Sequence, residues 1–527
     1  MKKISILVLA IILLLPLYGV FATGGSEKKS GSEGKISTIN VAVPMLPETL
    51  EPGVSITTSL YRVSGNIFNN LIDFDFKGNE GLMPGLAESW KYIDGKTLEL
   101  YLRKGVKFHN GDELTSEDVA FTFSNERLMG EKPAVGSRRA ASFWAFFDRV
   151  EVVDKYTVRF YTKEPDPVMT NRLTLPAYKI INKRAYKEAK SFEEWSFSPI
   201  GTGPYKVKSL DPAAHLILEA HKDYWGGKPS ADTLIFRSVP EASARIAGLK
   251  AGDYQVISDV ATDLIKAIET DKNLVVEGGP SASFLVLMFN MYKPYMDVHL
   301  RQAMSLAIDR ELIIKNLFSG RTRTLNGLQE PGYGPMFVKE HPYPKYDLNK
   351  AKELLKKSKY NGEIINYYIF NDNYPNEVSV SQAMLEMWRA AGINVQIEVK
   401  ENRALASVLG PDKIRVVGMI NQSHTDLYGD PSGGLWRGYT PQSDSQTFYN
   451  WKGSDVDEFN KLGETLDSSI DQKVRYASAK RMLEIFDANP PAMIFYQNVV
   501  FAAKRKGIDW TAYRQVYMYF GPENFKQ

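Results

Sequence analysis

The clearest pattern of hydrophobic and polar positions lies within residues 82–123. Leucines alternate with polar residues over 98–102, which indicates a half-buried strand. Asp94-Gly95 separates this strand from a short run before it, and the dipeptide favours a type I′ hairpin turn because both positions then take positive φ. Thr115 or Ser116 can cap a helix with an acidic first turn. The pattern predicts a hairpin and a helix, and no residue here points to catalysis.

Beyond residue 290, strand-like and helix-like segments alternate along the chain. Hydrophobic residues at helical spacing predict one long amphipathic helix over 301–318. The aromatic-rich stretch 138–147 is predicted to be a helix with a core face rather than a ligand-facing cluster. Such alternation is typical of βαβ units, so we expect an α/β fold. Other predicted elements are strands at 39–43, 284–289, 365–370, 395–399 and 415–420, and helices at 378–391, 456–466 and 473–487.

The length and charge of the chain limit the classes of protein it can be. A chain of 527 residues is too long for one hydrophobic core, so two or three lobes are expected. Its 43% hydrophobic and 24% charged residues are typical of a globular protein. The net charge is +3, and two of these charges are Lys2 and Lys3 of the leader. A nearly neutral body argues against nucleic-acid binding.

The N-terminus has the pattern of a secretory signal peptide. Lys2 and Lys3 precede an apolar run over residues 4–17, and small residues, Val20 and Ala22, suit a cleavage site. We expect residues 1–22 to be removed near Ala22, the alternative being a retained membrane anchor, for which the run is short. The Gly/Ser-rich residues 23–35 are predicted to be a flexible leader.

The chain contains no cysteine. This excludes disulfides, thiol catalysis, thiolate metal sites and a lipid-modified N-terminal cysteine. A secreted, unlipidated protein of this size is best retained behind an outer membrane. We therefore expect it in the periplasm of a two-membraned bacterium.

Several ordered phrases resemble one known family. They are 82–90 (LMPGLAESW), 102–112 (LRKGVKFHNGD), 115–119 (TSEDV), 201–205 (GTGPY), 224–229 (YWGGKP) and 301–310 (RQAMSLAIDR). With these phrases the chain resembles the extracytoplasmic solute-binding proteins of family 5, the peptide/nickel-type components of ABC importers. Their order and spacing hold across nearly all of the chain that follows the leader.

The resemblance implies a periplasmic-binding-protein type II-like fold of the cluster C kind. This is an α/β fold with α+β lobes, in which two lobes are joined by a hinge and accompanied by an extra domain. Segments near residues 285 and 495 would form the hinge. The implied parts are domain I at 36–67, 198–285 and 496–527, an extra domain II at 68–197, and domain III at 286–495.

The implied function is binding rather than catalysis. The protein would be a monomer that captures an oligopeptide or similar solute by hinge closure and delivers it to the transmembrane permease subunits, without a cofactor. An oligosaccharide-binding or chelated-nickel-binding member of the same family is the alternative. A secreted hydrolase is a distant one, because the chain has no Gly-x-Ser-x-Gly and no His-Glu-x-x-His motif.

The segment 421–436 is the most informative about the ligand. It follows a predicted strand, and clefts of α/β domains form at such strand ends. Peptide-binding relatives pair the ligand's amino group with an aspartate four residues before a proline, where this chain has Leu427 before Pro431. A one-residue insertion would restore Asp426 to this role; otherwise the amine anchor is missing and a non-peptide solute is favoured. Asp430 is expected to be a structural turn residue.

Other candidate ligand contacts come from the same segment, from Tyr439 just after it, and from two further loops. Aromatic rings in the segment are expected either to stack on a ligand or to belong to the core. The remaining candidates follow predicted strands, so they line the cleft or form solvated turns. One histidine in the segment, without cysteine, is a weak transition-metal site, so no metal ligands are predicted. The candidates are Tyr428, Trp436, Tyr439, Asn371, Asp372, Tyr374, Met45, Leu46 and His424.

Overall fold

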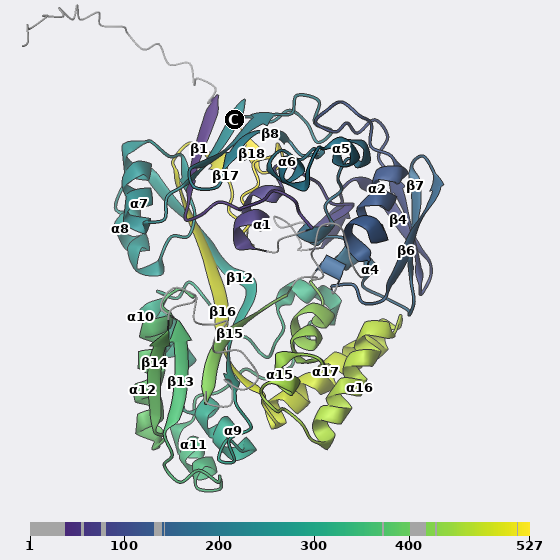
Figure 1. Ribbon diagram of the computed structural model, residues 1–527. Helices are drawn as coiled ribbons and strands as arrows, with labels where there is room; N and C mark the ends of the chain where they lie inside the picture. The colour runs from purple at the N-terminus through teal and green to yellow at the C-terminus, as the bar shows by residue number, and fades with distance from the viewer. Residues whose placement is uncertain are drawn as a thin grey trace, which may run out of the picture. The chain divides into compact units, whose positions relative to one another are not determined.

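A mixed sheet of ten described strands organises the protein (Figure 1). The computed structural model describes residues 37–53, 57–74, 81–130, 140–141, 143–370, 374–400, 418–426, 429–513 and 515–526. The predicted signal peptide and leader lie outside these ranges. Within them, no helix combines the length and the hydrophobicity needed to cross a membrane. In sheet order the strands are β14 (Val395–Lys400), β13 (Ile365–Phe370), β15 (Met419–Thr425), β12 (Leu274–Phe289), β16 (Ala492–Arg505), β11 (Val256–Ile257), β1 (Thr38–Val43), β10 (Thr233–Ser238), β9 (His215–Ala220) and β8 (Tyr205–Asp211).

Two long antiparallel strands, β12 and β16, connect the two halves of this sheet (Figure 1). The end of β16 also pairs with β11, whereas the second half of β12 pairs with β15. Their mutual register is interrupted between Pro280 and Phe284. Gly278 lies beside this interruption at φ 116°, a conformation that favours glycine. The hinge expected near residues 285 and 495 stays a prediction.

The apolar run predicted as one buried strand is the second half of β12. Its successive side chains enter two different hydrophobic cores, because neighbouring residues of a strand face opposite sides. Leu285 and Leu287 pack in one core, whereas Phe284 and Val286 pack in the other. This explains why the run shows no alternation of hydrophobic and polar residues.

The single helix predicted over 301–318 is wrong. The structure has two helices there, α9 (Val298–Leu306) and α10 (Arg310–Leu317). The second begins because the Asp309 carboxylate accepts the backbone N–H of Leu312 as an N-cap. Hydrophobic spacing alone does not show a cap within a continuous amphipathic pattern.

The predicted hairpin is present in a separate four-stranded sheet. The sheet has the order β4 (Ala87–Asp94), β5 (Thr97–Leu102), β7 (Thr157–Thr162) and β6 (Phe147–Asp154). The type I′ turn is wrong, since neither Asp94 nor Gly95 has positive φ. Instead, the Asp94 carboxylate accepts the Lys96 N–H at 2.7 Å, which closes a side-chain turn. The following α2 (Ser116–Thr122) has Thr115, one of the two expected caps, at its N-cap, in a capping box with Asp118 of the acidic first turn.

The aromatic stretch over 138–147 was predicted to be a helix with a core face. Three of its aromatic side chains do lie in the core, but its second half is not helical. Phe143, Trp144 and Phe147 are buried, but residues 143–146 form turns and β6 begins at Phe147. Residues 131–139 and 142 lie outside the described part. The burial of these three rings is therefore confirmed, whereas the helix is wrong over 143–147, although residues 140–141 are helical.

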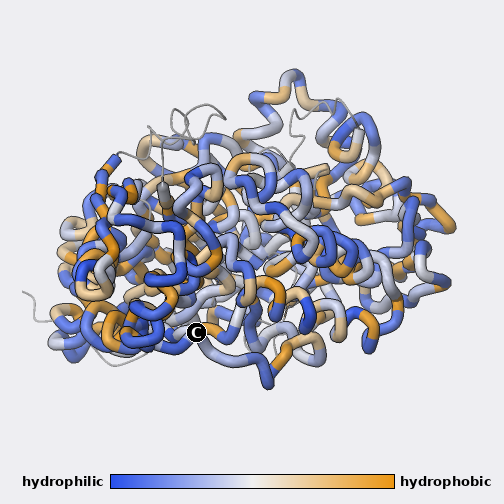
Figure 2. Tube along the Cα trace, turned by 90° about the horizontal axis from the view of Figure 1, so that it is seen from below, coloured by the Kyte–Doolittle hydropathy of each residue, from blue (hydrophilic) through white to orange (hydrophobic). Residues whose placement is uncertain are grey.

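Four hydrophobic clusters fill the described part of the chain. Figure 2 shows hydrophobic positions spread over the trace in short runs between hydrophilic ones. The domain boundaries given above stay a prediction. The remaining helices are α1 (Thr58–Ser64), α4 (Met169–Arg172), α5 (Lys183–Glu188), α6 (Phe192–Phe197), α7 (Ala242–Ala251), α8 (Ile265–Glu269), α11 (Leu348–Leu355), α12 (Glu377–Ala391), α15 (Asp444–Thr447), α16 (Ser454–Ser468) and α17 (Gln472–Ala488), and the remaining strands are β2 (Ile72–Phe74), β3 (Leu82–Pro84), β17 (Asp509–Trp510) and β18 (Phe525–Lys526).

Candidate functional site

The strand before the predicted ligand loop runs further than the sequence indicated. It was expected to end at Ile420, but β15 continues to Thr425 because it pairs antiparallel with β12. His424 is therefore a strand residue opposite Phe284 and not part of a loop. The loop proper begins at Asp426, and the predicted residues 415–417 lie outside the described part.

Asp426 is buried at the end of β15, with 2% of its surface exposed. Its backbone N–H donates to the Ala282 carbonyl at 2.9 Å, and its Oδ2 accepts the Gly429 N–H at 2.8 Å. The carboxylate thus holds the backbone of Gly429 close to the end of the strand. Ala282 belongs to the irregular part of β12, so Asp426 is attached to the segment where the two halves of the sheet connect.

A second buried carboxyl, Glu330, lies close to Asp426. Its Oε2 accepts a hydrogen bond of 3.0 Å from Nε2 of Gln497, which is a buried residue of β16. Oε1 of Gln497 in turn accepts Nε of Arg323 at 2.7 Å. Burial, followed by the negative charge of Asp426, raises the pKa of Glu330 to about 8, and Arg323 opposes this. At neutral pH one of the two carboxyl groups therefore carries a proton.

Tyr333 belongs to the same acidic cluster. Its side chain is 3% exposed, and its hydroxyl has no hydrogen-bond partner within the described residues. Burial first, and then the charges of Asp426 and Glu330, raise its pKa well above the usual value. A Cβ at Gly434 would lie 2.0 Å from the Tyr333 oxygen, so only glycine leaves room for the ring.

Asp430, four residues after Asp426, is held very differently. Arg475 donates to its Oδ1 at 2.6 Å, and the Ser432 backbone N–H donates to the same oxygen at 2.9 Å. Arg475 also donates to the Leu466 carbonyl at 2.8 Å. Both members of the ion pair are buried, so Asp430 fixes the loop against Arg475 of α17, in line with the turn role predicted for it.

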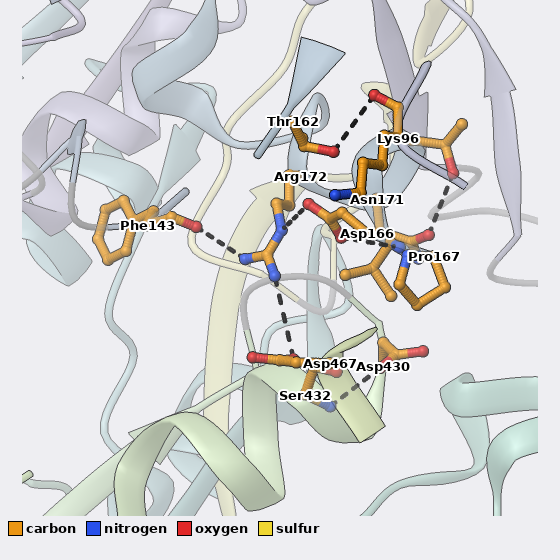
Figure 3. A network of polar contacts seen from close by, with 12 residues as sticks. Lys96, Phe143, Thr162, Asp166, Pro167, Asn171, Arg172, Asp430, Ser432 and Asp467 are labelled. Carbon is orange, nitrogen blue, oxygen red and sulfur yellow. Dashed lines mark hydrogen bonds and ion pairs between the residues drawn. The ribbon is translucent and has the colours of Figure 1, made fainter. Parts of the chain in front are cut away.

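A second arginine continues this network from α4 (Figure 3). Arg172 donates to Asp166 at 2.9 Å and to the Phe143 carbonyl at 2.8 Å. Its Nη2 also lies 4.0 Å from Oδ1 of Asp467, a residue of α16. Burial raises the pKa of Asp467 to about 6, and Arg172 opposes this. Residues far apart in the sequence are thereby joined beside the loop.

Trp436 and Tyr439, the two aromatic candidates of this region that the structure describes, lie in the core. The Trp436 ring packs 5.9 Å from that of Phe459, and Tyr439 is fully buried and stacks on His424 at 4.9 Å. Burial, with the nearby charge of Arg437, lowers the pKa of His424 to about 3, so its ring is neutral. Within the described residues no cluster of three or more metal-ligating side chains occurs. The roles of Trp436, Tyr439 and His424 as ligand contacts stay predictions.

The other predicted contacts are scattered. Met45 is 61% exposed after β1, whereas Leu46 is buried in the core beside that strand. Tyr374 is half-buried and packs against a different core. The remaining three candidates, Tyr428, Asn371 and Asp372, lie outside the described residues.

A cavity of about 180 Å³ that sequence reasoning missed lies near the loop. One of its walls is Phe74, whose ring lies 2.9 Å from the position of a Cβ at Gly429. Two of its lining residues are a half-buried carboxyl, that of Asp73, and a buried amine, that of Lys179. Burial raises the pKa of Asp73 to about 6, and the charge of Lys179 opposes this rise. Burial lowers the pKa of Lys179 to about 8, and the charge of Asp73 opposes this fall. A lysine within the apolar run 176–181 was the available signal. Other lining residues are Phe68, Asn69, Tyr224, Trp225, Tyr517, Tyr519 and Glu523.

Comparison with known sequences identifies the family. The model of the bacterial extracellular solute-binding proteins, family 5 Middle, matches residues 81–446. The dipeptide-binding protein of Escherichia coli (strain K12) is 31% identical over 333 residues, which are 59% of this chain and 61% of that protein. The chain thus aligns with less than two thirds of that relative. Di/tripeptide-binding protein 1 of Pseudomonas aeruginosa (strain UCBPP-PA14) is 28% identical over 499 residues, or 88% and 89% of the two chains.

A solved structure shows the same fold. The periplasmic binding protein DppA of Helicobacter pylori, in complex with the peptide STSA, superposes with a TM-score of 0.75 at 23% identity and covers 92% of this chain and 98% of its own. This confirms the predicted α/β fold of the periplasmic-binding-protein type II class. Because the family match spans more than half of the chain, the protein belongs to family 5 of the bacterial extracellular solute-binding proteins.

Proposed function

We propose that this protein is the substrate-binding component of an ABC importer and that its solute is a short peptide. The observation that carries the proposal is the buried acidic pair of Asp426 and Glu330 at the end of β15. A buried carboxylate is a favourable partner for an ammonium group, since charge-assisted hydrogen bonds are strong. The relatives named for di- and tripeptides support the same solute class.

Capture would proceed by bending at β12 and β16. The register interruption beside Pro280 allows the two halves of the sheet to rotate toward each other. A peptide shifts this equilibrium only by binding the closed form more tightly than the open one. Closure excludes water, which strengthens the contact between the peptide's amino group and Asp426. The closed form is then the one that the permease recognises.

The family supports a proposal for the compartment and the mode of action. Its members are binding proteins, and we propose that this one likewise turns over no solute. We place it in the periplasm as a monomer, after removal of residues 1–22. Its partners would be the transmembrane permease subunits.

An oligosaccharide is the second candidate, and the cavity beside Phe74 favours it. Tyr224, Trp225 and Tyr519 line it, and aromatic side chains are the kind on which sugar rings can stack. The Tyr224 and Tyr519 hydroxyls lie 3.1 Å apart and supply polar groups between the rings. The volume of about 180 Å³ suits a single sugar or one amino-acid side chain.

Thermal-shift screening of the ligand-stripped protein tests the proposal. Di- to pentapeptides and di- to pentasaccharides would be added separately, and a peptide at 100 times its Kd stabilises the protein by about 2.7 kcal/mol. The matched control is the same peptide with an acetylated N-terminus, which has the same shape without the ammonium charge. Stabilisation by a sugar and by no peptide would reject the peptide proposal, and turnover of any solute would reject a pure binding role.

A further inference from the structure

The cavity beside Phe74 has two groups of opposite charge in its wall, Asp73 and Lys179. Lys179 is 7% exposed, although lysine is rarely buried without a partner of opposite charge. Its ammonium donates to two neutral oxygens, Oδ1 of Asn70 at 2.9 Å and the Phe68 carbonyl at 3.3 Å. Within the described residues it forms no ion pair with the half-buried Asp73, whose charge nevertheless acts on it. The two charges therefore border one space without pairing directly.

Both groups carry their charge at neutral pH. The pKa of Asp73, which burial raises to about 6, still lies below 7, and that of Lys179, which burial lowers to about 8, still lies above it. Glu523 also lines the cavity, but it is exposed, and its carboxylate accepts the Tyr519 hydroxyl at 2.7 Å. A group that enters between Asp73 and Lys179 therefore meets a charged acceptor and a charged donor.

The two amides in the wall already form hydrogen bonds within the fold. Nδ2 of Asn70 donates to two backbone carbonyls, and its Oδ1 accepts Lys179. Nδ2 of Asn69 donates to the Tyr224 hydroxyl, and its Oδ1 accepts two donors. An ammonium group has more donors than the two that Lys179 uses here, and a carboxylate has several acceptor positions. Asp73 and Lys179 are therefore the groups best able to bond an incoming molecule.

Apolar side chains form another part of the wall. Phe74 of β2 and Met83 of β3 line the cavity, and Pro176 lines it from the segment that leads to Lys179. Asp73 lies opposite Met83 in the β2–β3 pair, so the carboxylate and this apolar wall come from one hairpin. Methylene groups gain free energy in such surroundings. With its volume of about 180 Å³, the cavity suits one side chain that has an apolar stem and a polar end.

The cavity adjoins the loop of the proposed amine site. The Phe74 ring lies 2.9 Å from the position of a Cβ at Gly429, and Oδ2 of Asp426 accepts the Gly429 N–H at 2.8 Å. A peptide whose ammonium group lies at Asp426 therefore begins close to the cavity, and one of its first side chains can enter it.

We propose that this cavity is a subsite for a carboxamide side chain of the bound peptide, that of glutamine or asparagine. The inference rests on the proposed function and names the peptides that the site prefers. The amide oxygen accepts a hydrogen bond from Lys179, and the amide N–H donates to Asp73. A side-chain carboxylate is repelled by Asp73 and a side-chain ammonium by Lys179, whereas a neutral amide is bonded by both.

Isothermal titration calorimetry at pH 7 with the peptides Ala-X-Ala and Ala-Ala-X tests the subsite. With Gln, Glu, Met or Lys at X, side chains of similar length end in an amide, a carboxylate, an apolar group or an ammonium. We expect the Gln peptide to bind about tenfold more tightly than the other three at one of the two positions. The reason is that a lost hydrogen bond to a charged group weakens Kd by about this factor.

Two variants should change the preference in opposite directions. Asp73→Asn removes the negative charge, so Glu at X should replace Gln as the tightest ligand. Lys179→Gln keeps a donor for Asn70 without the positive charge, so Lys at X should bind more tightly than before. Misfolding cannot produce opposite shifts. Lys187→Gln, at an exposed lysine of α5 that pairs with Glu126, is the control and should keep the native order.

The other outcomes are distinct. Equal Kd values for all four side chains at both positions, or tightest binding of Glu, Met or Lys by the native protein, would overturn the subsite and leave the proposed function standing. An oligosaccharide that binds the native protein but not Asp73→Asn would assign the cavity to a sugar and overturn the subsite as well. If none of these peptides and no peptide of the screening panel binds, the proposed function and the subsite both fail.

Discussion

Two aspartates of one loop, Asp430 and Asp426, are buried to a similar extent and yet are held in opposite ways. Asp430 meets an arginine, Arg475, at 2.6 Å, whereas Asp426 faces another carboxyl group, Glu330. A buried carboxylate beside an arginine has its charge compensated within the fold. Two carboxyl groups that lie near each other repel when both are ionised, and an added cation reduces this repulsion. The first arrangement stabilises the loop, and the second is suited to a ligand.

The largest expected effect comes from removing the cation of the first arrangement. Arg475→Met leaves Asp430 buried and uncompensated, which should lower the free energy of unfolding by about 3–5 kcal/mol. Urea unfolding at pH 7 measures it. The control is Arg481→Met, which removes an exposed arginine of the same helix and should change stability little. Equal effects of the two variants would show that Asp430 is no structural anchor.

Removing the charge of Asp426 should affect binding instead of folding. Asp426→Asn retains an oxygen that accepts the Gly429 N–H, so the loop keeps this hydrogen bond. The peptide's ammonium group, however, loses its partner in the closed site, which costs about 2–5 kcal/mol of binding free energy. The Kd should therefore weaken at least about thirtyfold. Stability should not fall, because the repulsion with Glu330 disappears. Calorimetry measures the Kd of trialanine and the Kd of N-acetyl-trialanine for the native protein and for the variant. A loss of affinity that is the same for the acetylated peptide would assign the effect to the loop's shape and not to the amine.

Asp467 is an intermediate case, since its arginine is present but 4.0 Å away. Its pKa is raised to about 6 in the folded protein, so the folded form binds a proton more readily than the unfolded one. The stability that this group contributes is full below about pH 4 and is lost as pH rises through 6. Asp467→Asn should therefore be more stable than the native protein by about 1–2 kcal/mol at pH 7.5, and equal to it near pH 4.

Chemical unfolding of both proteins at these two pH values measures the difference. The variant Asp471→Asn, at the exposed N-cap of α17, controls for general effects of charge removal. A difference that does not change with pH would mean that the carboxyl is ionised throughout, with Arg172 compensating it fully.

Local sequence patterns predicted most of the elements but little of the site. Strand β13 and helix α12 follow from periodicity within a short window, and so does the buried run of β12. The continuation of β15 to Thr425 depends on pairing with β12, where Thr425 lies opposite Ser283, 142 residues earlier in the chain, so no local signal marks it.

The acidic site depends even more on distant parts of the chain. Glu330 reads as an ordinary polar residue before a proline, and it acquires meaning only through Gln497, 167 residues later. Asp426 was found because the family places a carboxylate in this loop. Aromatic residues are hard to assign from the sequence. The sequence around Trp436 looks the same whether its ring faces a ligand or the core. The structure places the ring in the core.

The smallest expected effect concerns Arg323, whose charge lowers the pKa of Glu330. Arg323→Gln should therefore hold a proton on Glu330 more firmly. The two carboxyl groups then carry less negative charge to attract the peptide's ammonium group, and Kd at pH 7 should rise on the order of threefold. Calorimetry with trialanine measures this, and Arg321→Gln, at an arginine paired with the partly exposed Glu269, is the neighbouring control. If Arg323→Gln instead bound trialanine more tightly, removal of a competing cation would dominate, and Glu330 would be ionised before the peptide arrives.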